Sequence, residues 1–174
     1  AWCAAKGNYA ASLGWWTVNR LLDGLDGVVA RVDGRPTAFG GYLDIVLDYV
    51  VYAAIPVSLA IGVASPSVSQ AALFLLASFL VNAVSWTYLA ALLEQRVTSI
   101  TMPGGLIAGT ETMIFYTLFL LWPARLSTLF TIMTVLVVVT SLQRLAWAAR
   151  HLRGTRAPCI SNASQWREWQ LLSI

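Results

Sequence analysis

Acidic residues gather in one short part of the chain, where the surrounding sequence is otherwise apolar. Five of the eight Asp and Glu residues lie in this stretch: Asp23, Asp26, Asp33, Asp44 and Asp48. Carboxylate oxygens are the ligands of hard divalent cations, and Mg²⁺ in particular is held by a few carboxylates together with water and substrate phosphate. Two such ions would balance four carboxylates, so the pattern predicts a site for divalent cations.

Four of these acids, all but Asp33, lie in segments that are typical of membrane helices, and they need a positive partner there. An ionised carboxylate near the centre of a bilayer costs about 2.5–3.5 kcal/mol even on a lenient insertion scale. The surrounding sequence supplies no His or Cys for a softer metal, which argues against zinc and copper. A purely structural pairing with Arg20 and Arg31 is the alternative, but it leaves two acids without a basic partner.

Helix geometry allows the four acids to share one pocket. One arc of the first helix carries small and charged residues, at about 100° per residue: Asp23, Asp26, Gly27, Ala30 and Arg31. On the next helix Asp44 and Asp48 are one turn apart, and Gly40 lies one turn earlier. The short connection 32–37 makes the two helices antiparallel neighbours, with Asp23 and Asp48 at similar depths of about 12–15 Å. We expect the carboxylates to converge in a polar pocket that opens to the cytoplasm.

Small residues lie on the same arc as the acids of the first helix. Gly24, Gly27 and Ala30 remove side-chain bulk there, so a flat or charged ligand could approach the backbone. Close packing of one helix against another is the alternative role for small residues at these spacings.

The elements that position these residues form an all-α integral membrane protein. Of the 174 residues 58% are hydrophobic and 11% are charged, against about a quarter charged in a typical soluble domain. The excess of basic over acidic residues is small, so no nucleic-acid partner is expected. We expect a polytopic bundle with five transmembrane helices, at 11–32, 38–63, 69–93, 104–122 and 126–150. The residues before Gly7 are expected to be the end of a truncated further helix, which gives a six-helix fold.

A single transmembrane catalytic domain is expected over residues 1–152, followed by a polar tail over 153–174 that we leave unassigned. The basic residues of one end of the bundle are Arg31, Arg35, Arg96, Arg144, Arg150, Arg153, Arg156 and Arg167, whereas the other end has Lys6 and Arg125. By the positive-inside rule the Arg-rich end faces the cytoplasm. Trp15, Trp16, Trp122 and Trp147 lie near helix ends, as in an aromatic belt that anchors a protein at the membrane surface.

The spacing of the acids also resembles a known family. The residues from Asp23 to Asp48 match the pattern D-x2-D-G-x2-A-R-x8-G-x3-D-x3-D without a departure. This pattern is similar to that of the CDP-alcohol phosphotransferases, also called CDP-alcohol phosphatidyltransferases. The resemblance implies an inner-membrane transferase, usually a homodimer of six-helix protomers, that acts in phospholipid biosynthesis. Such an enzyme moves a phosphoalcohol from a CDP-alcohol to an acceptor hydroxyl and releases CMP.

The resemblance assigns roles to the matching positions. The aspartates at 23, 26, 44 and 48 would hold two divalent cations, Mg²⁺ or Mn²⁺, and Asp48 would be the general base. Three residues would border the nucleotide, namely Gly27, Ala30 and Gly40, and Arg31 would lie near its phosphates. The donor is expected to be CDP-diacylglycerol, because a lipid-embedded pocket suits a lipid-anchored substrate.

The acceptor is a small alcohol whose identity stays open among serine, glycerol phosphate, inositol or its phosphate, and choline. We expect Glu111, with Thr110 or Thr112, to contact this alcohol or to hold Arg31. A Glu satisfied by a neighbouring helix is the alternative. Three arginines, Arg96, Arg144 and Arg150, could bind a phosphorylated acceptor, but lipid headgroups are the preferred interpretation.

Three other functions are compatible with acids inside a membrane. A cation-coupled carrier would take up cations without any nucleotide, and it would not need Ala30, Arg31 and Gly40 at fixed spacing. A noncatalytic membrane assembly protein would tolerate Asn in place of the aspartates. A hydrolase of CDP-lipid would release CMP without any acceptor alcohol.

Overall fold

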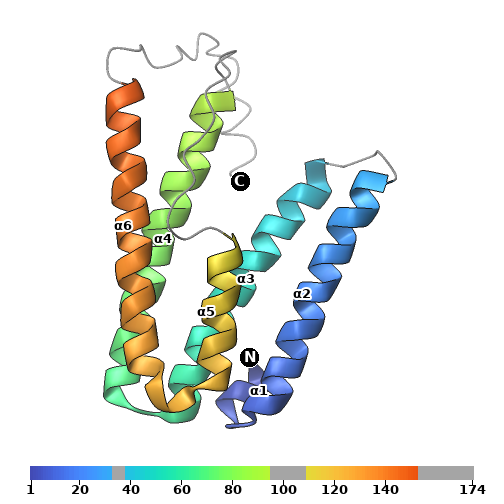
Figure 1. Ribbon diagram of the computed structural model, residues 1–174, viewed down its shortest axis with the longest axis vertical. Helices are drawn as coiled ribbons and strands as arrows, with labels where there is room; N and C mark the ends of the chain where they lie inside the picture. Colours follow the sequence, from blue (N-terminus) through green and yellow to red (C-terminus); the bar gives the residue numbers. More distant parts are fainter. Residues whose placement is uncertain (33–37, 95–108, 153–174) are drawn as a thin grey trace, which may run out of the picture.

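The computed structural model of the protein consists of helices (Figure 1). It describes residues 1–32, 38–94 and 109–152, and within these ranges the side chains of 23, 26–32, 38, 92–94 and 109 are not described. The elements in chain order are α1 (Trp2–Ala5), α2 (Tyr9–Val32), α3 (Ala38–Val63), α4 (Pro66–Glu94), α5 (Gly109–Leu121), the 3₁₀ turn η1 (Pro123–Arg125) and α6 (Leu126–Leu152).

Three segments of the described chain are long and apolar enough to cross a membrane. They are Phe39–Val63, Pro66–Ala91 and Pro123–Leu152. Of the other two expected crossings, α2 has 24 residues but carries several charges, and the apolar helix Thr110–Leu121 is shorter. The prediction of an all-α, polytopic membrane protein is confirmed.

The start of the chain forms a short helix that ends at a glycine, as expected. Gly7 has a φ of +73°, a left-handed conformation that closes the helix and that glycine adopts without strain. The next residue, Asn8, caps α2, because its side-chain oxygen accepts a hydrogen bond from the backbone N–H of Ala11 at 3.1 Å. This cap explains why α2 begins at Tyr9, two residues earlier than predicted.

The connection between α3 and α4 is shorter than the sequence suggested. Ala64 has a φ of +50° and ends α3, and α4 begins at Pro66 rather than at residue 69. Proline suits the first position of a helix because its φ is fixed near the helical value and its missing N–H would have no partner there. The predicted start of the fourth crossing, 104–108, lies outside the described residues.

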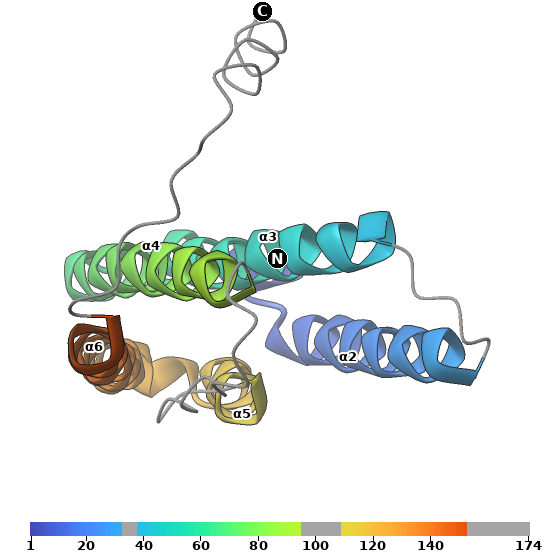
Figure 2. The same ribbon diagram turned by 90° about the horizontal axis from the view of Figure 1, so that it is seen from above.

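The core lies where α3, α4, α5 and α6 meet. Its largest fully buried side chains are Tyr116, Phe119, Phe130, Leu59, Leu75, Leu126 and Met133. Phe119 packs edge-to-face on Phe130 with ring centroids 4.7 Å apart, which joins α5 to α6. Helices α4 and α6 lie side by side (Figures 1 and 2).

The upper halves of α2 and α3 lean away from α4 and α6 (Figure 1). Every residue from Phe39 to Leu47 is exposed in the single chain. The C-terminal ends of α2, α4 and α6 and the N-terminal end of α3 lie at this same end of the bundle, opposite α1 and η1, whereas α5 begins further down (Figure 1). The acidic motif therefore occupies the open end of two helices that are packed at their other end.

Candidate active site

The helices carry the acidic motif with regular spacing. α2 continues as a helix through Asp23 and Asp26 to Val32, and α3 places Asp44 and Asp48 one turn apart. The side chains of Asp23, Asp26, Ala30 and Arg31, and the surroundings of Gly27, lie outside the described part of the structure. Their predicted roles therefore stay predictions.

An ion pair connects the two motif helices. The Nη2 of Arg20 on α2 donates to Oδ1 of Asp48 on α3 at 2.7 Å, and the side chains are 12% and 28% exposed. The hydroxyl of Tyr52 donates to the other oxygen, Oδ2, at 3.4 Å. Pairing of an acid with Arg20, the structural alternative considered from the sequence, is thus observed for Asp48. Because Arg20 lies three residues before Asp23, about 4.5 Å along the helix, the pair also supports similar depths for Asp23 and Asp48.

Aromatic rings hold the guanidinium of Arg20 in place. Its Cζ lies 4.9 Å from the ring centroid of Trp16 and 5.8 Å from that of Tyr52. Its Nε and Nη2 also lie 3.3 and 2.8 Å from Oδ1 of the neighbouring Asn19. Cation–π contacts of this kind are stronger where water is excluded, so Arg20 is a well-anchored cation beside Asp48.

Trp16, which contacts Arg20, is itself held in place by residues of α5. The indole N–H of Trp16 donates to Oγ1 of Thr117 at 3.1 Å, and its ring stacks on Tyr116 with centroids 5.5 Å apart. Trp16 is only 5% exposed, so the interpretation of this residue as part of an anchoring belt is wrong. Trp15 and Trp122 are 69% and 59% exposed, in keeping with that interpretation.

The hydroxyl of Tyr116 also supplies a hydrogen bond that the backbone of α3 lacks. Pro56 lies inside α3 and has no N–H, so it cannot donate to the carbonyl of Tyr52 four residues earlier. The hydroxyl of Tyr116 donates to this carbonyl at 2.6 Å. The link fixes α5 against α3 one turn away from Asp48.

This link sets the depth of the predicted acceptor residues. Helices α3 and α5 run in the same direction (Figure 1), and Tyr116 meets Tyr52. One turn earlier on each helix lie Thr112 and Asp48, which places the start of α5 at the depth of the acid. Thr112 is 5% exposed.

The other two predicted acceptor residues, Thr110 and Glu111, are exposed and belong to the first turn of α5. The predicted nucleotide-bordering residue Gly40 is also exposed. A methyl group added at Gly24 would meet no atom within 4 Å, so packing within the described chain does not require a glycine there.

Among the side chains that the structure describes, no three His, Cys, Asp or Glu residues lie close enough to hold a metal ion. These side chains include those of Asp44 and Asp48 but not those of Asp23 and Asp26. Of the two that can be placed, Asp44 is exposed and Asp48 is half-buried.

A second basic residue lies inside the bundle. Arg144 on α6 is 6% exposed, and its Nη1 donates to Oδ1 and to the backbone oxygen of Asn82 on α4, at 2.8 and 3.1 Å. The headgroup interpretation is therefore wrong for Arg144, because its charge lies between helices. It fits Arg150, which is exposed, whereas Arg96 lies outside the described residues. The missed sequence signal was Asn82, a polar residue in an otherwise apolar span.

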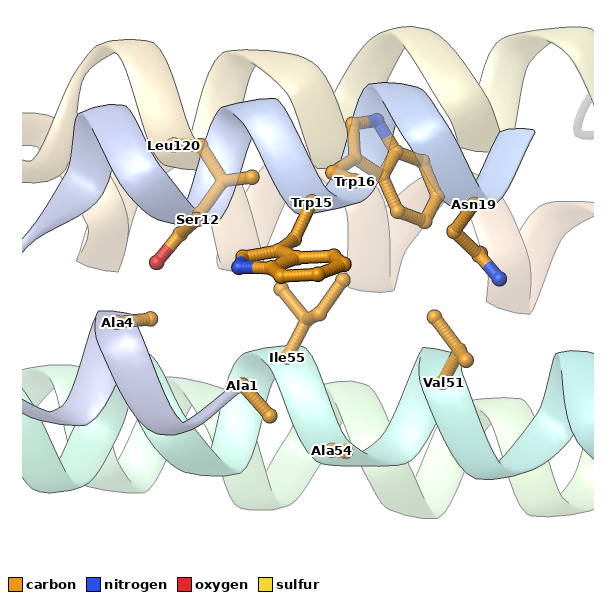
Figure 3. A pocket seen from close by; sticks show the side chains of 10 residues that line it. All are labelled: Ala1, Ala4, Ser12, Trp15, Trp16, Asn19, Val51, Ala54, Ile55 and Leu120. Atoms are coloured by element: carbon orange, nitrogen blue, oxygen red, sulfur yellow. The ribbon is translucent and has the colours of Figure 1, made fainter. Parts of the chain in front are cut away.

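A cavity of about 200 Å³ lies between α2 and α3, beside α1 (Figure 3). Trp15 and Ile55 face each other across it, and Val51 and Leu120 add further apolar surface. Asn19, which contacts Arg20, lines one end. The cavity is therefore mostly apolar and ends at a residue that contacts Arg20.

Comparison with known proteins identifies the family of the chain. The family model "CDP-alcohol phosphatidyltransferase" matches residues 1–147. The chain is 34% identical over 148 residues to "Inner membrane protein YnjF" of Escherichia coli (strain K12), covering 80% of this chain and 71% of that protein. No solved structure matches the chain significantly. Since the matched region contains both motif helices and reaches into α6, the chain belongs to the CDP-alcohol phosphatidyltransferase family.

Proposed function

We propose that the protein transfers a phosphatidyl group from CDP-diacylglycerol to the hydroxyl of a small alcohol and releases CMP. The observation that supports this most directly is the acidic motif, carried by two helices that the Arg20–Asp48 pair holds together. We place the catalytic domain at residues 1–152 in an inner membrane, with the site facing the cytoplasm, and expect the homodimer that is usual in the family. On the described helices, Arg31, Arg144 and Arg150 lie in the C-terminal parts of α2 and α6, toward the end that carries the motif, which supports this orientation.

The carboxylate oxygens of the acidic motif are suitable ligands for divalent cations. Asp44 and Asp48 present carboxylates one turn apart, and Asp48 already binds a cationic group. We assign Asp23, Asp26, Asp44 and Asp48 as the ligands of two ions, Mg²⁺ or Mn²⁺. Ions held there would neutralise the charge that builds on the diphosphate as its bond breaks.

Asp48 has a second assigned role as the general base. A half-buried carboxylate can accept the proton of the acceptor hydroxyl when that hydroxyl is within hydrogen-bond reach. Glu111, Thr110 and Thr112 are assigned to the acceptor, since the start of α5 lies at the depth of Asp48. Gly27, Ala30 and Gly40 are assigned to the nucleotide, and Arg31 to its phosphates.

The apolar cavity between α2 and α3 is assigned to part of one acyl chain of the donor. Its walls, with Trp15 and Ile55, are mostly apolar, and its end at Asn19 lies next to the Arg20–Asp48 pair. A lipid headgroup at the acids would thus continue into hydrocarbon without leaving the protein.

The test is CMP release from CDP-diacylglycerol by the purified protein in nanodiscs, with Mg²⁺ or Mn²⁺ and a panel of alcohols. We expect CMP release that depends on one class of alcohol and falls roughly 100-fold or more in Asp44→Asn, because a ligand to the charge-stabilising ions is lost. Gly14→Ala is the matched control, since a methyl group there meets no atom within 4 Å.

Three results would contradict the proposal. Full-rate product formation by Asp44→Asn would exclude the metal assignment. CMP release without any alcohol would identify a hydrolase. Cation uptake into vesicles without nucleotide, together with no CMP release, would identify a carrier.

A further inference from the structure

We infer that Arg20 is a positioning residue that occupies Asp48 before divalent cations do and that weakens their binding. This inference rests on the proposed function, because it concerns the same carboxylates. The observation behind it is that a ligand assigned to a metal ion already forms a 2.7 Å ion pair with a guanidinium.

The side chains around Arg20 hold its guanidinium in one position. The Trp16 ring at 4.9 Å and the Tyr52 ring at 5.8 Å hold the guanidinium, and Oδ1 of Asn19 lies 2.8 Å from its Nη2. Tyr52 also donates to Oδ2 of Asp48, so one residue contacts both members of the pair. Arg20 is therefore held on Asp48 by neighbours from both α2 and α3.

Two physical effects make Arg20 and a divalent ion competitors. Both use an oxygen of Asp48, and the hydrogen bond from Nη2 occupies a lone pair of Oδ1 that an ion could otherwise use. In addition, a unit positive charge in contact with a ligand repels an incoming cation, and this repulsion is strong where water is scarce. Ion binding must then displace the guanidinium from Oδ1 or overcome its charge.

The ion pair with Arg20 would also help the protein to insert into the membrane. Without ions, an unpaired carboxylate at the depth of Asp48 would oppose insertion, and Arg20 neutralises it. When the negatively charged diphosphate of the donor brings further charge, ions and donor together would outcompete Arg20.

The test measures Mn²⁺ affinity by electron paramagnetic resonance, with the full chain in nanodiscs and without nucleotide. We expect Arg20→Gln to bind Mn²⁺ about tenfold or more tighter than the natural protein, because the positive charge is gone. Arg20→Lys keeps the charge and should stay near the natural affinity. Asp48→Asn in the Arg20→Gln background should abolish the gain, since the shared ligand is missing.

Unchanged or weaker Mn²⁺ binding by Arg20→Gln, with binding by the natural protein intact, would overturn the inference and leave the proposed function standing. Should Arg20→Gln not fold, Arg20→Met keeps an apolar stem between the rings of Trp16 and Tyr52 and serves as the second neutral variant. Absence of Mn²⁺ binding in the natural protein, together with no CMP release, would overturn the metal assignment itself.

Discussion

Asp48 is the residue at which the structural and the chemical requirements of this protein meet. One of its oxygens pairs with Arg20 and the other accepts from Tyr52, so its position is fixed from two helices. The same carboxylate is assigned both to a metal ion and to the acceptor proton. Its neighbours therefore affect chemistry as well as stability, and variants near it need a control that separates the two effects.

The variant Tyr116→Phe tests stability without removing a residue that is assigned to the chemistry. This variant removes the 2.6 Å hydrogen bond to the carbonyl of Tyr52, which Pro56 cannot serve. We expect a loss of about 1–3 kcal/mol in the free energy of unfolding, because a buried acceptor is left unsatisfied. Thermal unfolding in detergent micelles measures the loss.

The matched control is the same change in a Pro56→Ala background, where the introduced alanine supplies the N–H that the proline lacks. The effect of Tyr116→Phe should be clearly smaller there, as a double-mutant cycle reports. Equal losses in both backgrounds would contradict the assignment of Tyr116 as the replacement donor.

At the scale of elements, the approach of α1 to α3 depends on one glycine. A Cβ built on Gly62 would lie 2.5 Å from the carbonyl oxygen of Ala4 and 3.1 Å from that of Ala5. We expect Gly62→Ala to displace α1 and to destabilise the protein by about 1–3 kcal/mol, because backbone atoms cannot move aside as a flexible side chain can. The midpoint of thermal unfolding is the measurement.

Gly14→Ala in α2 is the control for helix propensity. Nothing lies within 4 Å of its Cβ position, so it should gain up to about 1 kcal/mol from the better helix former. If both variants shift the midpoint alike, the contact between α1 and α3 does not decide stability.

The sequence predicted the positions of the helices better than the contacts between their side chains. Charge-free apolar runs located α3, α4 and α6 to within a few residues, and the acidic motif was recognisable from spacing alone. Pairing of Arg20 with an acid was one alternative from the sequence, but the choice of Asp48 and the burial of Trp16 were not predictable, because both depend on how α2 is rotated toward α3 and α5. A periodic pattern determines the position of a residue around its helix, but not the helix that faces it.

The burial of Arg144 was missed for a related reason. An Arg near the end of a membrane helix is typical of a headgroup contact, and only the facing Asn82 on α4 makes an inner position favourable. The contact between α4 and α6 therefore decides whether Arg144 is buried or faces the lipid headgroups.

At the scale of the whole molecule, the two ends of the bundle should lie on opposite sides of the membrane. Ser67 and His151 are exposed at opposite ends of the helices. In a background with Cys3→Ala and Cys159→Ala, we expect Ser67→Cys to react with an impermeant maleimide in right-side-out vesicles. His151→Cys should react only after permeabilisation, because we expect the Arg-rich end to face the cytoplasm. The reverse pattern would contradict the orientation.

The central claim is that carboxylates from α2 and α3 hold divalent cations together, and counting Mn²⁺ ions tests it most directly. In nanodiscs with CDP present, we predict about two bound ions per chain, and a lower count both in Asp23→Asn on α2 and in Asp44→Asn on α3. A count that neither substitution changes, or that falls with only one helix, would contradict the account.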